Sequence, residues 1–77
     1  MMGTAVAGQK VALMVNGARR EIPAGWSLAD LLVSLELDPR LVVIEHSGAI
    51  LRDRGSFSRV ELARNDTLEI VHFVGGG

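Results

Sequence analysis

Three glycines, Gly75, Gly76 and Gly77, are the residues of this 77-residue chain whose type and spacing most strongly suggest chemistry. Because glycine lacks a Cβ and adopts φ angles that other residues avoid, such a run forms a thin segment that can enter a narrow active site. Three extended residues reach about 10 Å, and the carboxylate of Gly77 lies at the tip. Taken alone, the run is also typical of a linker stub or a frayed chain end.

The side chains offer little other chemistry. His46 and His72 do not lie in a cluster with metal-ligand spacing, so we expect polar surface or strand-end roles for them and no metal site. The chain has no cysteine, which excludes disulfides and thiolate metal sites. No Ser-His-Asp set, glycine-rich phosphate loop or pair of carboxylates can be recognised. We therefore expect no catalytic residue, no bound cofactor and no independent enzyme activity.

Length and charge narrow the class of protein. A chain of 77 residues forms one domain with a modest core. Its formal net charge is −1 and its basic residues are dispersed among the acidic ones, so we expect no nucleic-acid partner. The apolar stretches fall short of the roughly 20 residues that span a bilayer, and no secretory signal is recognisable. We expect no membrane association, a cytoplasmic location, a disordered leader over residues 1–9, a domain over residues 10–74 and a flexible tail over residues 75–77.

The elements that must position the glycines begin with a hairpin. Asn16-Gly17 separates the apolar run Leu13–Val15 from residues 18–22 and is typical of a type I′ turn, so it predicts two antiparallel strands. With a period of two, the apolar residues of the first strand share one face. Ile22 is the expected contribution of the second strand, which a proline then ends.

A helix is predicted next. Leucines recur at i, i+3, i+4 and i+7 and form one apolar stripe, made of Leu28, Leu31, Leu32 and Leu35. Ser27 is the expected N-cap, and Asp30 at the third helical position completes a capping box. We expect Trp26 to pack in the core rather than to serve as a ligand platform. Asp38-Pro39 is expected to end the helix, because proline cannot continue its hydrogen-bond ladder.

A third and a fourth strand follow the helix. Val42 and Ile44 alternate with Val43 and Glu45 in the third strand. Ser47-Gly48 offers a turn, and Ala49–Leu51 is a short return strand. Residues 52–58 are predicted to form a solvated loop that holds a turn of helix around its phenylalanine.

The last strand leads to the glycines. Within Thr67–Val74, Leu68 and Ile70 face one way, whereas Val71 and Phe73 face the other. The outward pair is either a docking patch for a partner or an ordinary case of scattered surface apolar residues. The order β-β-α-β-β-β predicts an α+β fold of the β-grasp, ubiquitin-like type, in which a mixed four- to five-stranded sheet packs on one main helix.

With this order in place, the chain resembles the thiamine-biosynthesis sulfur carriers, the ThiS family, whose members end in Gly-Gly. The resemblance covers nearly all of residues 11–77 and is carried by Val15-Asn16-Gly17, Ser27-Leu28-Ala29-Asp30-Leu31-Leu32, Ser47-Gly48 and the ending from Asp66 to Gly77. The family usually has Asn-Gly at Ser47-Gly48 and Gly-Asp at Asn65-Asp66. Both substitutes suit turns.

The resemblance implies that the Gly77 carboxylate is the reactive group. An E1-like, ThiF-like activating enzyme would use ATP to join it to AMP, and a sulfur donor system would convert the adenylate to a thiocarboxylate. That group would deliver sulfur to an intermediate held on a ThiG-like thiazole synthase. Gly75 and Gly76 would thread the partner active sites, with Val71 and Phe73 as the docking residues. The chain would then be a protein co-substrate that is consumed and recharged.

Two other interpretations remain open. The small subunit of molybdopterin synthase has the same fold, a Gly-Gly end and the same thiocarboxylate chemistry, although short length and the ending His72-Phe73-Val74-Gly75-Gly76 favour the thiazole carrier. Copurification with thiazole synthase rather than with a large synthase subunit would separate the two. A noncovalent ubiquitin-like binding module, in which the glycines are incidental, predicts that deleting Gly76 and Gly77 leaves every interaction intact.

Overall fold

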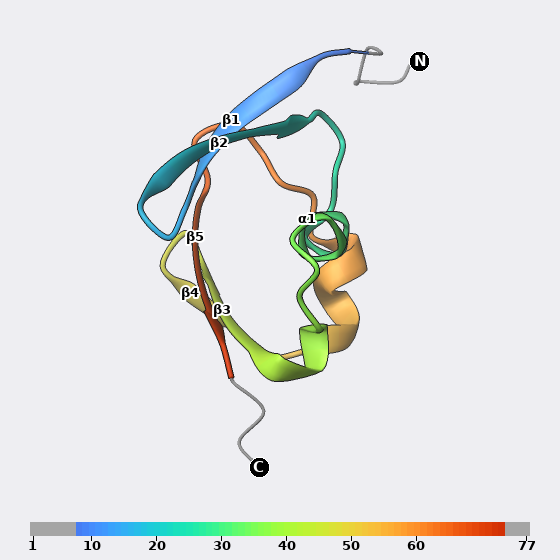
Figure 1. The fold of residues 1–77 in the computed structure, drawn as a ribbon, viewed down its shortest axis with the longest axis vertical. Coiled ribbons are helices and arrows are strands. Elements are labelled where there is room, and N and C mark those ends of the chain that lie inside the picture. The colour runs from blue at the N-terminus through green and yellow to red at the C-terminus, as the bar shows by residue number, and fades with distance from the viewer. Residues whose placement is uncertain (1–7, 74–77) are drawn as a thin grey trace.

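Five strands form one mixed sheet, and the main helix crosses one of its faces (Figure 1). The computed structural model describes residues 8–73. Its strands are β1 (Lys10–Val15), β2 (Ala18–Pro23), β3 (Val42–His46), β4 (Ala49–Leu51) and β5 (Thr67–His72); the helices are α1 (Leu28–Ser34) and two short 3-10 helices, η1 (Pro39–Leu41) and η2 (Arg54–Arg59). The sheet order is β2-β1-β5-β3-β4, with β1 and β5 parallel and the other neighbours antiparallel. This arrangement confirms the predicted β-grasp fold.

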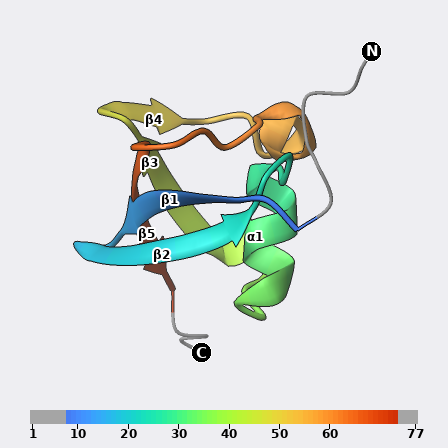
Figure 2. The same cartoon turned by 90° about the horizontal axis from the view of Figure 1, so that it is seen from above.

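The sheet has two unlike faces. Figure 2 shows α1 and η2 on the same side of the strands, so this side is the inner face. The other side, the outer face, has no helix over it in the part of the chain that the structure describes. Leu68 and Ile70 of β5 point inward and are buried, as the period of two predicts.

The first hairpin forms as the Asn-Gly turn predicts. The φ angles of Asn16 and Gly17 are +51° and +81°, which are the two left-handed positions that a type I′ turn requires. β1 and β2 pair from Lys10 opposite Pro23 to Val15 opposite Ala18.

The start of α1 is fixed by a capping box. The Ser27 hydroxyl accepts from the backbone N–H of Asp30 at 3.1 Å, and the Asp30 carboxylate accepts from the backbone N–H of Ser27 at 2.8 Å. Two backbone N–H groups that have no partner inside the helix are thereby satisfied. Three of the four stripe leucines are buried, namely Leu28, Leu31 and Leu32, and Trp26 packs against the core.

The predicted end of this helix is wrong by one turn. Asp38-Pro39 was expected to end it, but α1 stops at Ser34 and Leu35 is the C-cap. Glu36 has a φ of +58°, its N–H donates to Val33 at 3.0 Å, and the Leu37 N–H donates to Leu32 at 2.9 Å. These two bonds form a Schellman motif, which ends a helix when the residue after the C-cap is left-handed. Glycine usually signals that position, and here a glutamate occupies it.

Residues after β4 close the core. η2 carries Phe57, which is 2% exposed, and Leu62 is equally buried; this confirms the expected turn of helix around that phenylalanine. The buried core consists of Leu13, Val15, Ile22, Leu28, Leu31, Leu32, Val42, Ile44, Phe57, Leu62, Leu68 and Ile70. Each such side chain stabilises the fold by about 1.5 to 3 kcal/mol through burial.

Most of the predicted leader and Val74, at the predicted end of the last strand, lie outside the described residues. Gln9, from the predicted leader, is among the described residues, and its carbonyl accepts a hydrogen bond from the Ala24 N–H at 3.0 Å. No described helix is long and apolar enough to cross a membrane.

Candidate functional site at the end of strand β5

The middle strand β5 leads directly toward the glycines. It lies between β1 and β3, and its last residue, His72, precedes Phe73, whose N–H donates to the Leu41 carbonyl at 2.7 Å. The predicted site residues Gly75, Gly76 and Gly77 lie outside the described residues. What the structure shows of the site is therefore its base, a strand held in the centre of the sheet.

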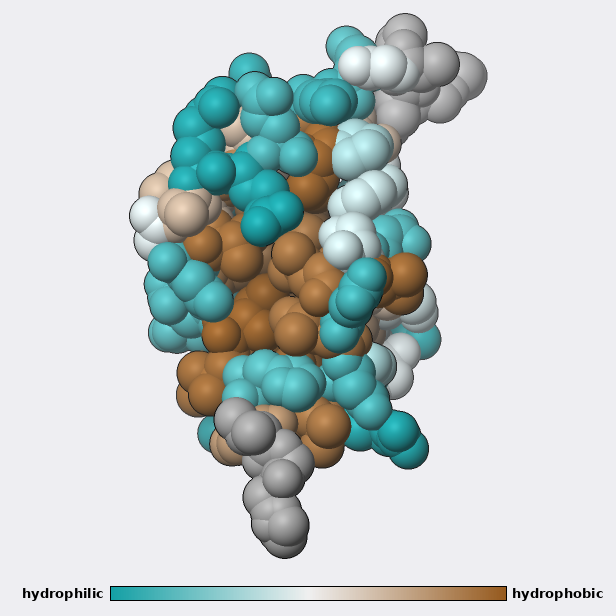
Figure 3. All heavy atoms as spheres, viewed as in Figure 1, coloured by the Kyte–Doolittle hydropathy of each residue, from teal (hydrophilic) through white to brown (hydrophobic). Residues whose placement is uncertain are grey.

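An exposed apolar patch lies on the outer face beside this base. Val71 and Phe73 are 57% and 51% exposed, as expected for residues that alternate with the buried ones. Val43 lies directly opposite Val71 on β3, and Ile50 on β4 is 53% exposed. We call these four residues the outer patch. Figures 1 and 3 are seen from the side, so the apolar middle of Figure 3 lies between the strands and α1, at the inner face of the sheet rather than at the outer patch.

On the β3 side, an arginine supports the strand next to β5. Arg54 donates to the Pro39 carbonyl at 2.9 Å through Nε and to the Val42 carbonyl at 3.1 Å through Nη2. Both carbonyls belong to residues close in sequence to Leu41, whose own carbonyl accepts the hydrogen bond from the Phe73 N–H. We predicted a solvated loop for residues 52–58, but this guanidinium has a structural role. No sequence signal marks it, because its partners are backbone carbonyls 12 and 15 residues away.

An ion pair caps η1 at the same end of the sheet. Arg40 donates to the Asp38 carboxylate from its guanidinium, at 2.8 Å for the shortest bond, and from its backbone N–H at 2.9 Å. The side-chain bond first, and the backbone bond next, lower the pKa of Asp38 to about 2. The same pairing raises the pKa of Arg40.

The two histidines take separate structural positions. His46 Nε2 lies 2.9 Å from Asp66 Oδ2, at the far end of β5 from the outer patch. His72 is exposed at the last position of β5. Among the described residues, no three His, Cys, Asp or Glu side chains gather as metal ligands would.

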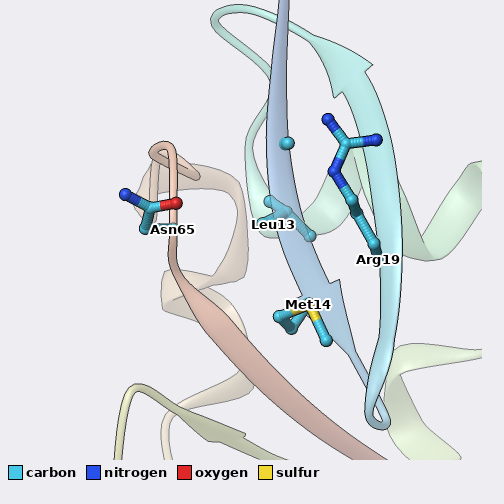
Figure 4. A pocket seen from close by; sticks show the side chains of 5 residues that line it. Leu13, Met14, Arg19 and Asn65 are labelled. Carbon is cyan, nitrogen blue, oxygen red and sulfur yellow. The ribbon is translucent and has the colours of Figure 1, made fainter.

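A shallow pocket of about 240 Å³ lies elsewhere on the molecule. Figure 4 shows it between β1, β2 and the loop that precedes β5, lined by Ala12, Leu13, Met14, Arg19 and Asn65. Arg19 also pairs with Glu21 at 3.1 Å. The pocket lies by the start of β5, so it does not contribute to the base of the glycine tail.

A mixed five-stranded sheet packed on one main helix, with a central strand that precedes the glycines in the sequence, defines a β-grasp protein. The ThiS family model matches residues 7–77, and this chain belongs to the ThiS family. The resemblance seen in the sequence is thereby confirmed. The two departures from the usual family pattern fall in turns, where Ser47 and Asn65 have φ angles of +48° and +71°.

Individual relatives agree with the family. The chain is 41% identical over 51 residues to the sulfur carrier protein ThiS of Bacillus subtilis strain 168, covering 66% of this chain and 76% of that one. It is 38% identical over 63 residues, 82% of its length, to a thiazole synthase of Magnetococcus marinus, and 37% identical over 65 residues, 84% of its length, to one of Paramagnetospirillum magneticum. It spans only 19% and 20% of those two synthases, about a fifth of each.

A solved structure shares the fold. The crystal structure of thiamine biosynthesis protein ThiS from Geobacter metallireducens superposes with a TM-score of 0.72 at 27% identity, covering 87% of this chain and all of that one. The matched names belong to the thiamine pathway, which favours the thiazole carrier over the small subunit of molybdopterin synthase.

Proposed function

We propose that this chain is a sulfur carrier for thiazole formation in thiamine biosynthesis. The observation that carries the proposal is membership of the ThiS family, joined to a central strand that leads to Gly75, Gly76 and Gly77. The chain supplies the reacting carboxylate and the surface that partners recognise. The catalytic groups belong to its partners, so the chain is a protein co-substrate.

The chemistry takes place at the Gly77 carbon in two steps. A ThiF-like activating enzyme joins the carboxylate to the α-phosphate of ATP and releases pyrophosphate, which turns a poor electrophile into an acyl adenylate. A sulfur donor then forms a C–S bond to the same carbon as the C–O bond to AMP breaks. The product is a thiocarboxylate. A ThiG-like thiazole synthase takes the sulfur as the C–S bond breaks, and an oxygen supplied by water or by the substrate bonds to the same carbon and regenerates the carboxylate.

The outer patch is the surface that we propose for docking. Exposed apolar side chains that gather on one face mark protein interaction sites more often than scattered ones do. Val71 and Phe73 belong to the patch and are also the last residues of the rigid sheet before the tail. A partner bound there holds a fixed base a few residues from Gly77. The tail then needs to search only a small volume.

The test is the intact mass of the chain after incubation with ATP, a sulfur source and the activating enzyme from the same genome. We expect a gain that matches replacement of one oxygen by sulfur. The matched variant lacks Gly76 and Gly77 and should show no gain while keeping the same unfolding temperature, because the described core excludes both residues. A variant that still gains sulfur, or a full chain that never does with an active enzyme, would favour the noncovalent binding module.

A further inference from the structure

Strand β1 stops pairing with β5 before β5 ends. The two strands align at Met14 opposite Thr67 and at Val15 opposite Leu68. The Asn16 N–H still reaches the Leu68 carbonyl at 2.8 Å, after which the chain turns back into β2. In a strand, successive residues direct their hydrogen-bonding groups to alternate edges. Both backbone groups of Ile70 therefore point at an edge where β1 has already left.

The side chain of Asn16 fills the place of the missing strand. Its Oδ1 accepts from the Ile70 N–H at 2.7 Å, and its Nδ2 donates to the Ile70 carbonyl at 3.2 Å. A carboxamide carries the same donor and acceptor as a peptide group, so it can pair with a strand as another strand would. Ile70 is 8% exposed, and without the amide its two backbone groups would lose these partners at a part-buried position.

These bonds place the last two-sided anchor of β5 at Ile70. Beyond it, the strand is held on the β3 edge, where the Phe73 N–H meets Leu41 at 2.7 Å. Gly77 follows Ile70 by seven residues, the difference between their positions in the chain. The direction of β5 at its end is therefore set by the Asn16 amide on one edge and by β3 on the other.

We propose that Asn16 is a positioning residue for the reactions at Gly77, in addition to its place in the hairpin turn. The inference rests on the proposed function. Asn16 touches neither ATP nor the reacting carbon. It acts through Ile70 by keeping the end of β5 aligned with the sheet. When the amide is absent, the carboxylate spends less time in line with the group that it must attack. The outer patch still docks, because the Asn16 side chain bonds to the backbone of Ile70, which is not a member of the patch and whose own side chain is buried on the inner face.

The experiment compares Asn16→Gly with Asn65→Gly. Both positions have positive φ, which glycine adopts without strain, so neither change disturbs its turn. Only Asn16 bonds to β5 through its side chain; among the described residues, Asn65 makes no side-chain hydrogen bond. For each chain, kcat and KM of thiocarboxylate formation are measured by intact mass, at a temperature where thermal unfolding shows the chain to be folded.

We expect Asn16→Gly to lower kcat by roughly tenfold to a hundredfold, as a misplacement of about 1 Å can do, with KM within about twofold of the parent. Asn65→Gly should leave both constants unchanged. Asn16→Asp, which keeps the acceptor but not the donor, should give an intermediate kcat and provides a milder variant if Asn16→Gly does not fold. Amide hydrogen exchange at Ile70 and Phe73 should quicken in Asn16→Gly but not in Asn65→Gly.

The outcomes separate the two proposals. A parent chain that takes up no sulfur from an active enzyme overturns the proposed function and the role of Asn16 with it. If the parent chain takes up sulfur and the two glycine variants have equal kcat, only the role of Asn16 is overturned. A loss in Asn16→Gly that falls wholly on KM also overturns it, because that result assigns the side chain to docking.

Discussion

The two ends of strand β5 are held in different ways. At its start, the Asp66 carboxylate pairs with His46 and also accepts from the Ala63 N–H, both at 2.9 Å. Backbone bonds join the Met14 N–H to Asp66 at 2.9 Å and the Ser47 N–H to Thr67 at 2.7 Å. At its end, β5 stays paired with β3 as far as His72 opposite Val42, and the Phe73 N–H donates to Leu41, whereas the other edge is held by the amide of Asn16.

The start of β5 therefore anchors the strand in the sheet, whereas its end presents side chains to partners. The start of β5 is bonded to β1 on one side and to the turn after β3 on the other, so it fixes the strand in the sheet. The end of β5 pairs with another strand on one edge only and carries exposed apolar side chains at Val71 and Phe73. We therefore expect substitutions at the start of β5 to change the free energy of unfolding, and substitutions at its end to change the rate of thiocarboxylate formation.

The largest expected effect is on stability at the buried start of the strand. Leu68→Ala removes a side chain that is 1% exposed and should lower the free energy of unfolding by about 2 to 5 kcal/mol. Val71→Ala, three residues later and 57% exposed, should change it by less than about 0.5 kcal/mol. Urea denaturation of both variants checks the pair. Similar losses in the two variants would contradict the comparison.

The second effect is on thiocarboxylate formation and concerns the exposed end of β5. Val71→Asp places a charge in the outer patch and should lower kcat/KM for thiocarboxylate formation by roughly tenfold or more, which is about 1.4 kcal/mol. Val33→Asp is the matched control, because Val33 is 75% exposed on α1, away from the outer face. Initial rates at several carrier concentrations give both values. Equal losses in the two variants would remove the docking role from the patch.

A third test compares polar contacts at the two ends. Asp66→Ala leaves His46 and the Ala63 N–H without their acceptor and should cost about 1 to 2 kcal/mol of stability. Arg54→Ala removes bonds to Pro39 and Val42 from an exposed side chain, and should cost less than about 1 kcal/mol. Thermal unfolding measures both. A greater loss in Arg54→Ala would show that the end of the strand needs more support than the start.

The smallest effect concerns pH at η1. Arg40 holds the pKa of Asp38 at about 2, below its usual 3.8, so the folded state binds this proton less readily than the unfolded chain. The contribution of the pair to stability is present above the unfolded pKa and is lost as pH falls through about 2. An NMR titration should find that midpoint for the Asp38 carboxyl. In Arg40→Ala, the midpoint should return toward 3.8, and an unchanged midpoint would exclude Arg40 as the cause.

Local signals made much of the fold predictable. Asn16-Gly17 predicted the hairpin, Ser27 with Asp30 predicted the helix start, and the alternation in β5 predicted which residues face outward. Each depends on residues within a few positions of one another. The helix end was missed because a left-handed Glu36, rather than glycine, ends it.

The supports of the site were not predictable in the same way. Asn16 reaches Ile70 across 54 positions, and Arg54 reaches carbonyls 12 and 15 positions away. All these partners are backbone groups, which every residue carries, so no residue type marks them. The glycines themselves were recognised from type and spacing, and their chemistry stays a proposal.

The place of β5 in the sheet has a consequence for synthesis of the protein. The strand formed last along the described chain is the one that joins β1 to β3. A nascent chain that has not yet released residues 67–72 from the ribosome has two hairpins and a helix but no central strand to join the hairpins into one sheet. Such long-range pairing forms late in folding. An enzyme that recognises the outer patch therefore finds it assembled only after β5 has paired with β3.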